Sequence, residues 1–309
     1  MKAGSTTRRS FWKGLLGSSL VGLLNATALK ASKHTYKFRY ILASCMYGKT
    51  GLAEILPEVH KIGAEHIDIW PERHGNQREQ IEAMGHPRFI ELLKQHQVKL
   101  GILTHYDLGP FRVENGLRNA KKFGGTMVIC GSGGTSGLKD IELKTVVKQF
   151  FEKMKPQIAV AEELGITLGI ENHGGTMLSS PDSLRWFGEL APSKNIGIAL
   201  APYHLPQDSR LLANLIKELD TCLVHFYVWQ YGQGSHEMAK EQELQQLPGR
   251  GVLDFRTIVQ ALKEVNYQGW TEIFMHPYPR GVPILEPTAE VTAEINQARR
   301  YLESLLYEA

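Results

Sequence analysis

Residues 167–175 read Thr-Leu-Gly-Ile-Glu-Asn-His-Gly-Gly, an apolar run that ends in a carboxylate, an amide and an imidazole. As a strand, the run would be buried on both faces, as the strands of a parallel sheet are. Glu171 and His173 would then emerge at the end of this strand. A charged group at the tip of a buried strand is costly unless it binds a metal or pairs with another charge. The stretch therefore indicates either a functional site or a salt bridge to a neighbouring strand.

Strand-like runs alternate with helical segments eight times along the 309-residue chain. The strands are expected over residues 38–43, 66–70, 100–104, 126–130, 167–171, 196–200, 222–228 and 270–274. This cadence predicts βαβ units and a parallel sheet, and eight rounds fit a closed (β/α)8 TIM barrel better than a doubly wound sheet. No GxGxxG motif follows the first strand, which also argues against a dinucleotide-binding fold. We expect a single α/β barrel domain over residues 36–309.

The first 28 residues have the pattern of an export signal. Arg8 and Arg9 precede a modestly apolar run over residues 15–24, and Ala26-Thr27-Ala28 has a small-x-small cleavage pattern. This predicts a twin-arginine signal peptide over residues 1–28 and export to the periplasm, or a membrane tether if the segment stays uncleaved. Gly, Ser and Asn interrupt the run too often for a stable transmembrane span. The alternative is an ordinary basic N-terminus.

Composition narrows the class of protein. The formal net charge is only +3, so the chain has no electrostatic footprint for nucleic acid. The three cysteines lie in apolar, strand-like contexts and are expected to be buried thiols, with neither a disulfide framework nor a zinc-finger spacing. The glycine-rich run over residues 131–137 could cradle a phosphate, but it lacks the Lys-Ser/Thr of a phosphate-binding loop, so we infer no phosphorylated substrate from it. Assembly of several copies stays open.

The carboxyl ends of barrel strands form one rim, where the active sites of this fold lie. Glu171, His225 and Glu272 are all expected there, and two glutamates with a histidine are a ligand set for a divalent cation. We expect Mn²⁺, with Mg²⁺, Co²⁺ or Zn²⁺ as alternatives. The expected substrate contacts are His105, His173, His204, Trp70, Trp229 and Arg280. Aromatic faces suit the C–H surfaces of a sugar, although each such ring could instead be core or rim packing.

Three further stretches carry a resemblance to a known family. They are Leu223-Val224-His225, the segment Leu-Pro-Gly-Arg-Gly-Val-Leu-Asp-Phe over residues 247–255, and Gly269-Trp270-Thr271-Glu272. With residues 169–173, they make the mature chain resemble the xylose isomerase-like TIM barrels, the sugar phosphate isomerase/epimerase group that also contains the AP-endonuclease family 2 barrels. The resemblance implies that Glu171, His225 and Glu272 bind a metal, that the two glutamates form the acid/base pair, and that His204 contacts the substrate.

The chain departs from this family pattern at the sixth strand. That strand typically ends in Asp-x-x-His, and here the segment is Ala201-Pro202-Tyr203-His204. Loss of one ligand charge should weaken cation binding. Water or substrate could fill the vacancy, a nearby histidine could take it, or the metal could be lost. The arginine that epimerases of the group carry after the seventh-strand histidine is also absent, since Tyr231 lies in that region.

These residues permit enolisation of a sugar. A cation held by Glu171, His225 and Glu272 would bind two adjacent oxygens of a hydroxy-ketone and stabilise the enediolate, while the two carboxylates remove and return a proton. We therefore expect a metal-dependent isomerase or epimerase acting on a small carbohydrate, polyol or keto-sugar. The alternatives are a lyase or dehydratase acting on a keto-sugar or keto-glycoside, and a non-catalytic sugar-binding barrel. A phosphodiesterase is disfavoured, because neither further zinc ligands nor a basic DNA track is evident.

Overall fold

The computed structural model describes residues 36–236 and 239–308. The predicted twin-arginine segment over residues 1–28 lies outside the described residues and stays a prediction. The described residues from Tyr36 onwards form one compact unit.

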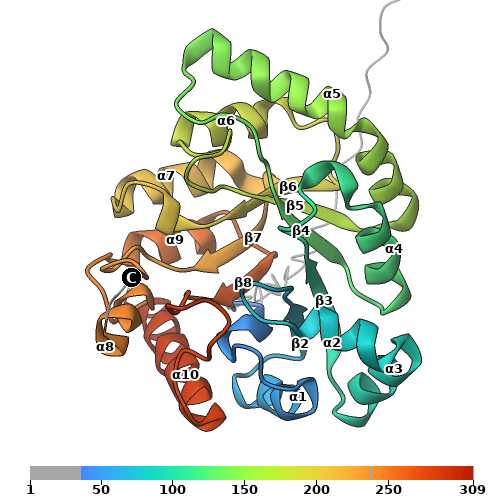
Figure 1. The fold of residues 1–309 in the computed structure, drawn as a ribbon. Coiled ribbons are helices and arrows are strands. Elements are labelled where there is room, and N and C mark those ends of the chain that lie inside the picture. The colour runs from blue at the N-terminus through green and yellow to red at the C-terminus, as the bar shows by residue number, and fades with distance from the viewer. Residues whose placement is uncertain (1–35, 237–238, 309) are drawn as a thin grey trace, which may run out of the picture. The chain divides into compact units, whose positions relative to one another are not determined.

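Eight strands, each hydrogen-bonded to the next and the last to the first, close into a parallel barrel. They are β1 (Tyr40–Ala43), β2 (His66–Ile69), β3 (Lys99–Thr104), β4 (Met127–Gly131), β5 (Thr167–Glu171), β6 (Ile196–Leu200), β7 (Leu223–Val228) and β8 (Trp270–Ile273). Figure 1 shows these strands at the centre of the ribbon with helices around them. The predicted TIM barrel is confirmed. The strands read as nearly continuous apolar runs because both of their faces are covered.

Helices connect successive strands on the outside of the barrel (Figure 1). They are α1 (Leu52–Lys61), α2 (Gln77–Met84), α3 (His86–Gln95), α4 (Glu114–Lys122), α5 (Asp140–Leu164), α6 (Pro181–Leu190), α7 (Ser209–Leu219), α8 (Lys240–Glu243), α9 (Arg256–Glu264) and α10 (Thr288–Leu305). The Ser180 hydroxyl caps α6 by accepting a hydrogen bond from the backbone N–H of Ser183. The short helix α8 was not predicted, because its sequence, Lys-Glu-Gln-Glu, has no apolar periodicity.

The register of the strands sets the height of each side chain in the barrel. Glu171 on β5 pairs with Ala199 on β6, and Ala199 pairs with His225 on β7. On the other side of β7, Tyr227 pairs with Glu272 on β8. His225 therefore stands level with Glu171, while Glu272 stands level with the residue two positions beyond His225. The predicted ligands thus come from strands that are staggered with respect to one another, as barrel closure requires.

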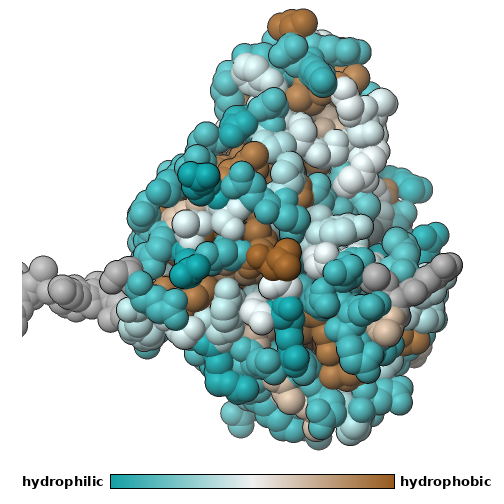
Figure 2. Space-filling view, turned by 90° about the vertical axis from the view of Figure 1, so that its left-hand side faces the viewer, coloured by the Kyte–Doolittle hydropathy of each residue, from teal (hydrophilic) through white to brown (hydrophobic). Residues whose placement is uncertain are grey.

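The outer surface is mainly hydrophilic, as the face in Figure 2 shows, with brown residues scattered among teal ones. None of the described helices has both the length and the apolar character needed to cross a bilayer. Cys45 and Cys130 are buried free thiols and Cys222 is a half-buried one, so the predicted thiol state of the cysteines is confirmed.

Candidate active site at the carboxyl rim

A cavity of about 320 Å³ opens at the carboxyl ends of the strands. Its polar lining side chains are His74, Tyr106, Glu171, His173, Thr176, His204, His276 and Arg280. Trp229 supplies an aromatic wall, and Gly131 and Gly133 bring backbone to the surface of the cavity. Concave sites of this size, with convergent polar groups and aromatic walls, are typical of small-molecule binding.

A second cavity of about 380 Å³ lies at the opposite end of the barrel, around Arg39 and the start of β8. Arg39 stacks there on the ring of Trp270, with its guanidinium carbon 3.5 Å from the ring centroid. In TIM barrels this end serves stability, and chemistry belongs to the carboxyl rim. We therefore assign the site to the smaller cavity.

Glu171 reaches this cavity from the last position of β5 while staying 4% exposed. Its pKa is raised to about 8, mainly by burial and in smaller part by the nearby carboxyl groups of Glu272 and Asp68, while a hydrogen bond from Tyr106 opposes the rise. His204 lies beside it, with Nε2 4.0 Å from Glu171 Oε1. Glu171 is thus a carboxyl that changes its charge near neutral pH inside a cavity, which is the property of a general acid/base.

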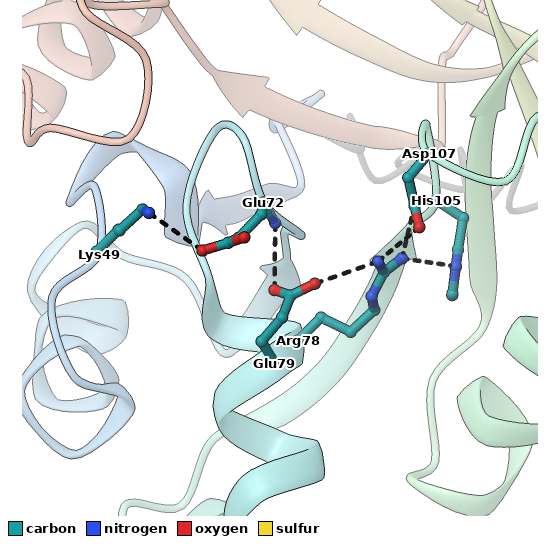
Figure 3. Close-up of polar contacts among 6 residues, drawn as sticks. All are labelled: Lys49, Glu72, Arg78, Glu79, His105 and Asp107. Atoms are coloured by element: carbon teal, nitrogen blue, oxygen red, sulfur yellow. Dashed lines mark hydrogen bonds and ion pairs between the residues drawn. The ribbon is translucent and has the colours of Figure 1, made fainter.

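Tyr106 is held over the cavity by the residues on either side of it in the chain. Arg78 donates two hydrogen bonds of 2.8 Å to the carboxylate of Asp107, and its Nη1 lies 2.9 Å from His105 Nδ1 (Figure 3). The Tyr106 hydroxyl lies 3.1 Å from that of Tyr227. Burial raises the pKa of Tyr106 well above its ordinary value, so the phenol stays protonated. It is therefore a neutral donor next to Glu171.

A fully buried polar layer lies below the cavity. Its members are Asp68 on β2, His225 on β7 and Glu272 on β8, all 0% exposed. Two residues further along the same strands stand Trp70, Tyr227 and Phe274, which face the same side. The rings of Trp70 and Tyr227 lie 4.9 and 5.3 Å from that of Phe274. These three rings form an aromatic layer between the buried polar groups and the mouth of the barrel.

His225 and Glu272 have the properties of two metal ligands. His225 Nε2 lies 3.0 Å from Glu272 Oε2, yet both ring nitrogens and both carboxyl oxygens lack a hydrogen-bond partner among the described residues. Nitrogen and oxygen atoms without hydrogen-bond partners are available as ligand atoms for a cation. However, no three His, Cys, Asp or Glu side chains of the described part of the chain converge closely enough to hold a metal ion. The described residues therefore fit a metal only in part, and the predicted three-ligand set with Glu171 stays a prediction.

Four histidines face the cavity in two pairs. The rings of His173 and His204 lie 4.0 Å apart, and those of His74 and His276 stack at 4.3 Å. Burial lowers the pKa of His74 and of His204 to about 3, with the positive charge of Arg280 contributing in both cases. Both imidazoles are therefore neutral at pH 7. A neutral imidazole can donate one hydrogen bond and accept another, which suits the hydroxyl groups of a sugar.

The structure places the predicted site residues in three groups. Five of them line the cavity, namely Glu171, His173, His204, Trp229 and Arg280. His225, Glu272 and Trp70 lie beneath it, in the buried polar layer and the aromatic layer. The eighth strand therefore contributes to the floor, and Glu272 lines no part of the cavity surface.

His105 was predicted to contact the substrate, but it does not line the cavity. It points away from the barrel axis, towards α4, where a Cβ on Gly116 would lie only 2.6 Å from its Nε2. Its neighbours Thr104 and Tyr106 point inwards, so the alternation of side chains along an extended segment turns His105 outwards. Its place is beside Arg78, in the network that holds Tyr106.

His276 is a cavity residue that the sequence reasoning missed. It follows β8 at the fourth position after Glu272, with Phe274 between them, so all three share one face. The spacing of two residues from Glu272 to Phe274 and from Phe274 to His276 was the sequence signal that could have identified His276 as an inward-facing residue. Asp68, near the end of β2, is a further buried group, and it accepts hydrogen bonds of 3.0 and 2.9 Å from the Thr104 hydroxyl.

Comparison with known proteins places this barrel in a family. The profile of the xylose isomerase-like TIM barrels matches residues 56–305. A closed eight-stranded barrel with its cavity at the carboxyl rim is the architecture of that class. The chain belongs to the xylose isomerase-like TIM barrel family. Comparison with curated protein sequences gave no significant match.

Solved structures share the fold at low sequence identity. The IolI protein with a bound zinc atom superposes with a TM-score of 0.65 at 14% identity, over 88% of this chain and 99% of that one. D-psicose 3-epimerase with D-tagatose, from Clostridium cellulolyticum H10, gives 0.65 at 13%, over 87% and 99%. The probable 3-DHS dehydratase AsbF from Bacillus anthracis gives 0.60 at 14%, over 84% and 97%. At such identities the likeness establishes the fold alone.

Proposed function

We propose that the chain is an enzyme that moves a proton on a carbon next to the carbonyl group of a small carbohydrate, with isomerisation as its reaction. One observation carries this proposal: the carboxyl of Glu171 lines the cavity, is almost fully buried, and has its pKa raised to about 8. A carboxyl poised near neutral pH suits both removal and return of a proton. Membership of a family named after a sugar isomerase supports the same reaction class.

In the proposed reaction, the Glu171 carboxylate takes the proton from the carbon between a hydroxyl and a carbonyl. The electron pair of the broken C–H bond forms a C=C bond to the carbonyl carbon while the carbonyl π pair moves onto its oxygen, which gives an enediolate. The proton of the neighbouring hydroxyl passes to that oxygen. The Glu171 carboxyl, whose proton exchanges with solvent, then protonates the former carbonyl carbon, and the oxygen that lost its proton becomes the new carbonyl, so a ketose becomes an aldose. The neutral phenol of Tyr106 can donate a hydrogen bond to the oxygen on which negative charge develops.

The number of carboxyl groups in the cavity favours isomerisation over epimerisation. Epimerisation needs proton transfer at both faces of one carbon, whereas a single base can carry a proton between neighbouring carbons on one face. Among the described residues that line the cavity, Glu171 is the one carboxyl. Glu272, the predicted partner base, lies under the aromatic layer.

The predicted dependence on a divalent cation remains part of the proposal. The unpartnered His225 and Glu272 support it, as does the zinc atom in the similar IolI structure. His225 and Glu272 would hold such an ion, and a bound cation would supply a Lewis acid. Mn²⁺ is the ion to test first.

Incubation with ketoses and aldoses in D₂O tests the proposal. The expected product is the isomer with deuterium at the carbon that receives the proton, and Glu171→Gln should lower its rate by at least a hundredfold. Glu91→Gln, on the exposed surface of α3, is the matched control. Full activity of Glu171→Gln would refute the proposal. A product that has lost water would indicate the lyase alternative, and absence of both product and deuterium exchange would indicate a sugar-binding barrel.

We further propose that the protein is exported through the twin-arginine route. The sequence pattern around Arg8 and Arg9 supports this. Cell fractionation should find the mature chain in the periplasm. Replacement of Arg8 and Arg9 by lysine should retain it in the cytoplasm, and unchanged fractionation of that variant would contradict the proposal.

A further inference from the structure

Arg280 is a cation without a partner in the wall of the cavity. Its guanidinium donates no hydrogen bond to any residue that the structure describes, and its Nη1 is buried. Arginine is usually found in this environment opposite a carboxylate, because its planar fork matches the two oxygens of that group. An unpaired, half-buried guanidinium that faces a cavity therefore indicates a ligand that supplies the anion.

The acidic groups nearest to Arg280 do not neutralise it. Glu243 contributes to its electrostatic environment, but its Oε2 lies 3.1 Å from Lys240 Nζ and its Oε1 accepts a hydrogen bond of 2.9 Å from the backbone of Tyr278. Its charge is thus already matched. Glu171 lies beside His204 and Tyr106 and is not among the groups that shift the pKa of Arg280. Arg280 is the one residue with a permanent positive charge among the described lining residues.

His74 adds a neutral donor to this part of the cavity. Its Nδ1 is buried and has no hydrogen-bond partner among the described residues, while its ring stacks on that of His276. Stacking fixes the plane of the ring, so the direction of the donor is set before a ligand arrives. A fixed neutral donor next to a guanidinium can complete the hydrogen bonds of one carboxylate.

We propose that the cavity binds sugar acids, with Arg280 and His74 holding the carboxylate of the substrate while its carbonyl end meets Glu171. This inference rests on the proposed function and names its substrate class. A single guanidinium with neutral histidines balances one negative charge, which is the charge of a carboxylate. A phosphate group carries close to two charges at neutral pH and would leave one of them unmatched.

Binding of matched ligands to the full-length protein tests the charge preference. D-glucuronate and D-glucuronamide differ only in the carboxylate, and D-galacturonate with its amide forms a second pair. Isothermal titration calorimetry should give a Kd at least tenfold lower for each acid than for its amide. The preference should shrink as salt is raised, because part of it is electrostatic.

Variants identify the residue responsible. Arg280→Gln should abolish the preference for the acid while leaving the Kd of the amide within threefold, and Arg118→Gln, on the exposed surface of α4, should change neither. Equal binding of acid and amide by the wild type overturns the proposal, as does a preserved preference in Arg280→Gln or no saturable binding of either acid. Tighter binding of glucose 6-phosphate than of glucuronate also overturns it, in favour of a phosphate.

Failure of this proposal can be told apart from failure of the proposed function. Binding needs no turnover, so Glu171→Gln should keep the preference for acids although it lacks activity. If Glu171→Gln is fully active while Arg280→Gln loses the preference, the function is wrong and the carboxylate site stands. If the preference is missing but neutral sugars are isomerised by a Glu171-dependent reaction, the function stands and the carboxylate site is wrong.

Discussion

His225 Nε2 lies 3.0 Å from Glu272 Oε2 in the fully buried floor of the barrel, without hydrogen-bond geometry between the two groups. Burial lowers the pKa of His225 to about 3 and raises the pKa of Glu272 well above its ordinary value. Without a cation the two side chains are therefore neutral. A metal ion that binds them must displace the proton of Glu272, which ties its affinity to pH.

Replacement of Ala201 by aspartate should strengthen metal binding. Position 201 is where the family resemblance places a ligand, and Ala201 is buried directly after β6. A further protein donor adds charge and a bond that the present ligands do not supply. We expect at least tenfold tighter binding of Mn²⁺ by calorimetry. Ala201→Asn, of the same size but without charge, is the control, and an unchanged Kd for the aspartate variant would contradict the predicted metal centre.

Stability without metal should fall with rising pH because of Glu171. Its folded pKa of about 8 lies above the ordinary value of 4.5, so its contribution to stability is fully present below pH 4.5 and is lost as the pH rises towards 8. The slope is about 1.4 kcal/mol for each pH unit in that window. Glu171→Gln cannot titrate and lacks this term.

Urea denaturation of both proteins at pH 5, 6.5 and 8, with a chelator present, measures the difference. The free energy of unfolding of Glu171→Gln relative to the wild type should rise steadily across this range. Buried histidines with lowered pKa values make the free energy of unfolding fall as the pH is lowered. Both proteins contain them, so their contribution largely cancels in the difference between the two. A difference that does not change with pH would mean that the carboxyl is ionised throughout.

The fold was predictable because its signals are local. The strand that ends at Glu171 follows from a few neighbouring apolar residues, and it was confirmed. Eight repeats of strand and helix then leave few arrangements other than a barrel. The short helix α8 had no such signal.

The depth of side chains in the barrel was not predictable in the same way. Glu272, Phe274 and His276 all face inwards by their period-two spacing, yet only His276 lines the cavity. Which of the three reaches the ligand depends on the stagger between β7 and β8, where Tyr227 pairs with Glu272. That stagger is a property of the closed sheet, so the sequence of one strand does not contain it.

Arg78 should act on the site through the position of Tyr106. The Arg78 guanidinium donates two hydrogen bonds to Asp107 and contacts His105 (Figure 3). Asp107 and His105 are the residues on either side of Tyr106 in the chain. Arg78→Lys keeps the charge but loses the two parallel hydrogen bonds. Because the hydrogen bond from Tyr106 lowers the pKa of Glu171, a displaced Tyr106 should raise that pKa further. The ¹³C shift of the Glu171 carboxyl, followed against pH, should show a higher midpoint.

The control for this prediction lies at the outer end of the same network. Lys49 forms an exposed ion pair of 3.1 Å with Glu72, in which both side chains are more than half exposed (Figure 3). Lys49→Ala should leave the midpoint of Glu171 unchanged, because exposed pairs contribute little. If Arg78→Lys and Lys49→Ala give the same midpoint as the wild type, Arg78 does not position Tyr106.

Replacement of Asn172 should lower both the stability of the barrel and the activity of the candidate active site. Its amide donates a hydrogen bond of 2.9 Å to the carbonyl of Ala201 and accepts one of 2.7 Å from the N–H of the same residue, all in full burial. These bonds join the end of β5, next to Glu171, to the turn that carries His204. Asn172→Ala leaves two buried backbone groups without partners and should cost about 2 to 4 kcal/mol.

Urea denaturation measures this cost against Asn296→Ala, which removes two surface hydrogen bonds, one of 3.0 Å to a backbone carbonyl and one of 3.2 Å from Arg299, and should change stability by less than about 0.5 kcal/mol. Asn172→Asp separates the two bonds. It keeps the acceptor for the N–H of Ala201 but turns an oxygen towards the carbonyl, so it should not restore stability. Because Asn172 sets the spacing of Glu171 and His204, the variants should also lose proton transfer in proportion to this disturbance. A stable Asn172→Ala protein with the activity of the wild type would show that the strand ends are held by the barrel alone.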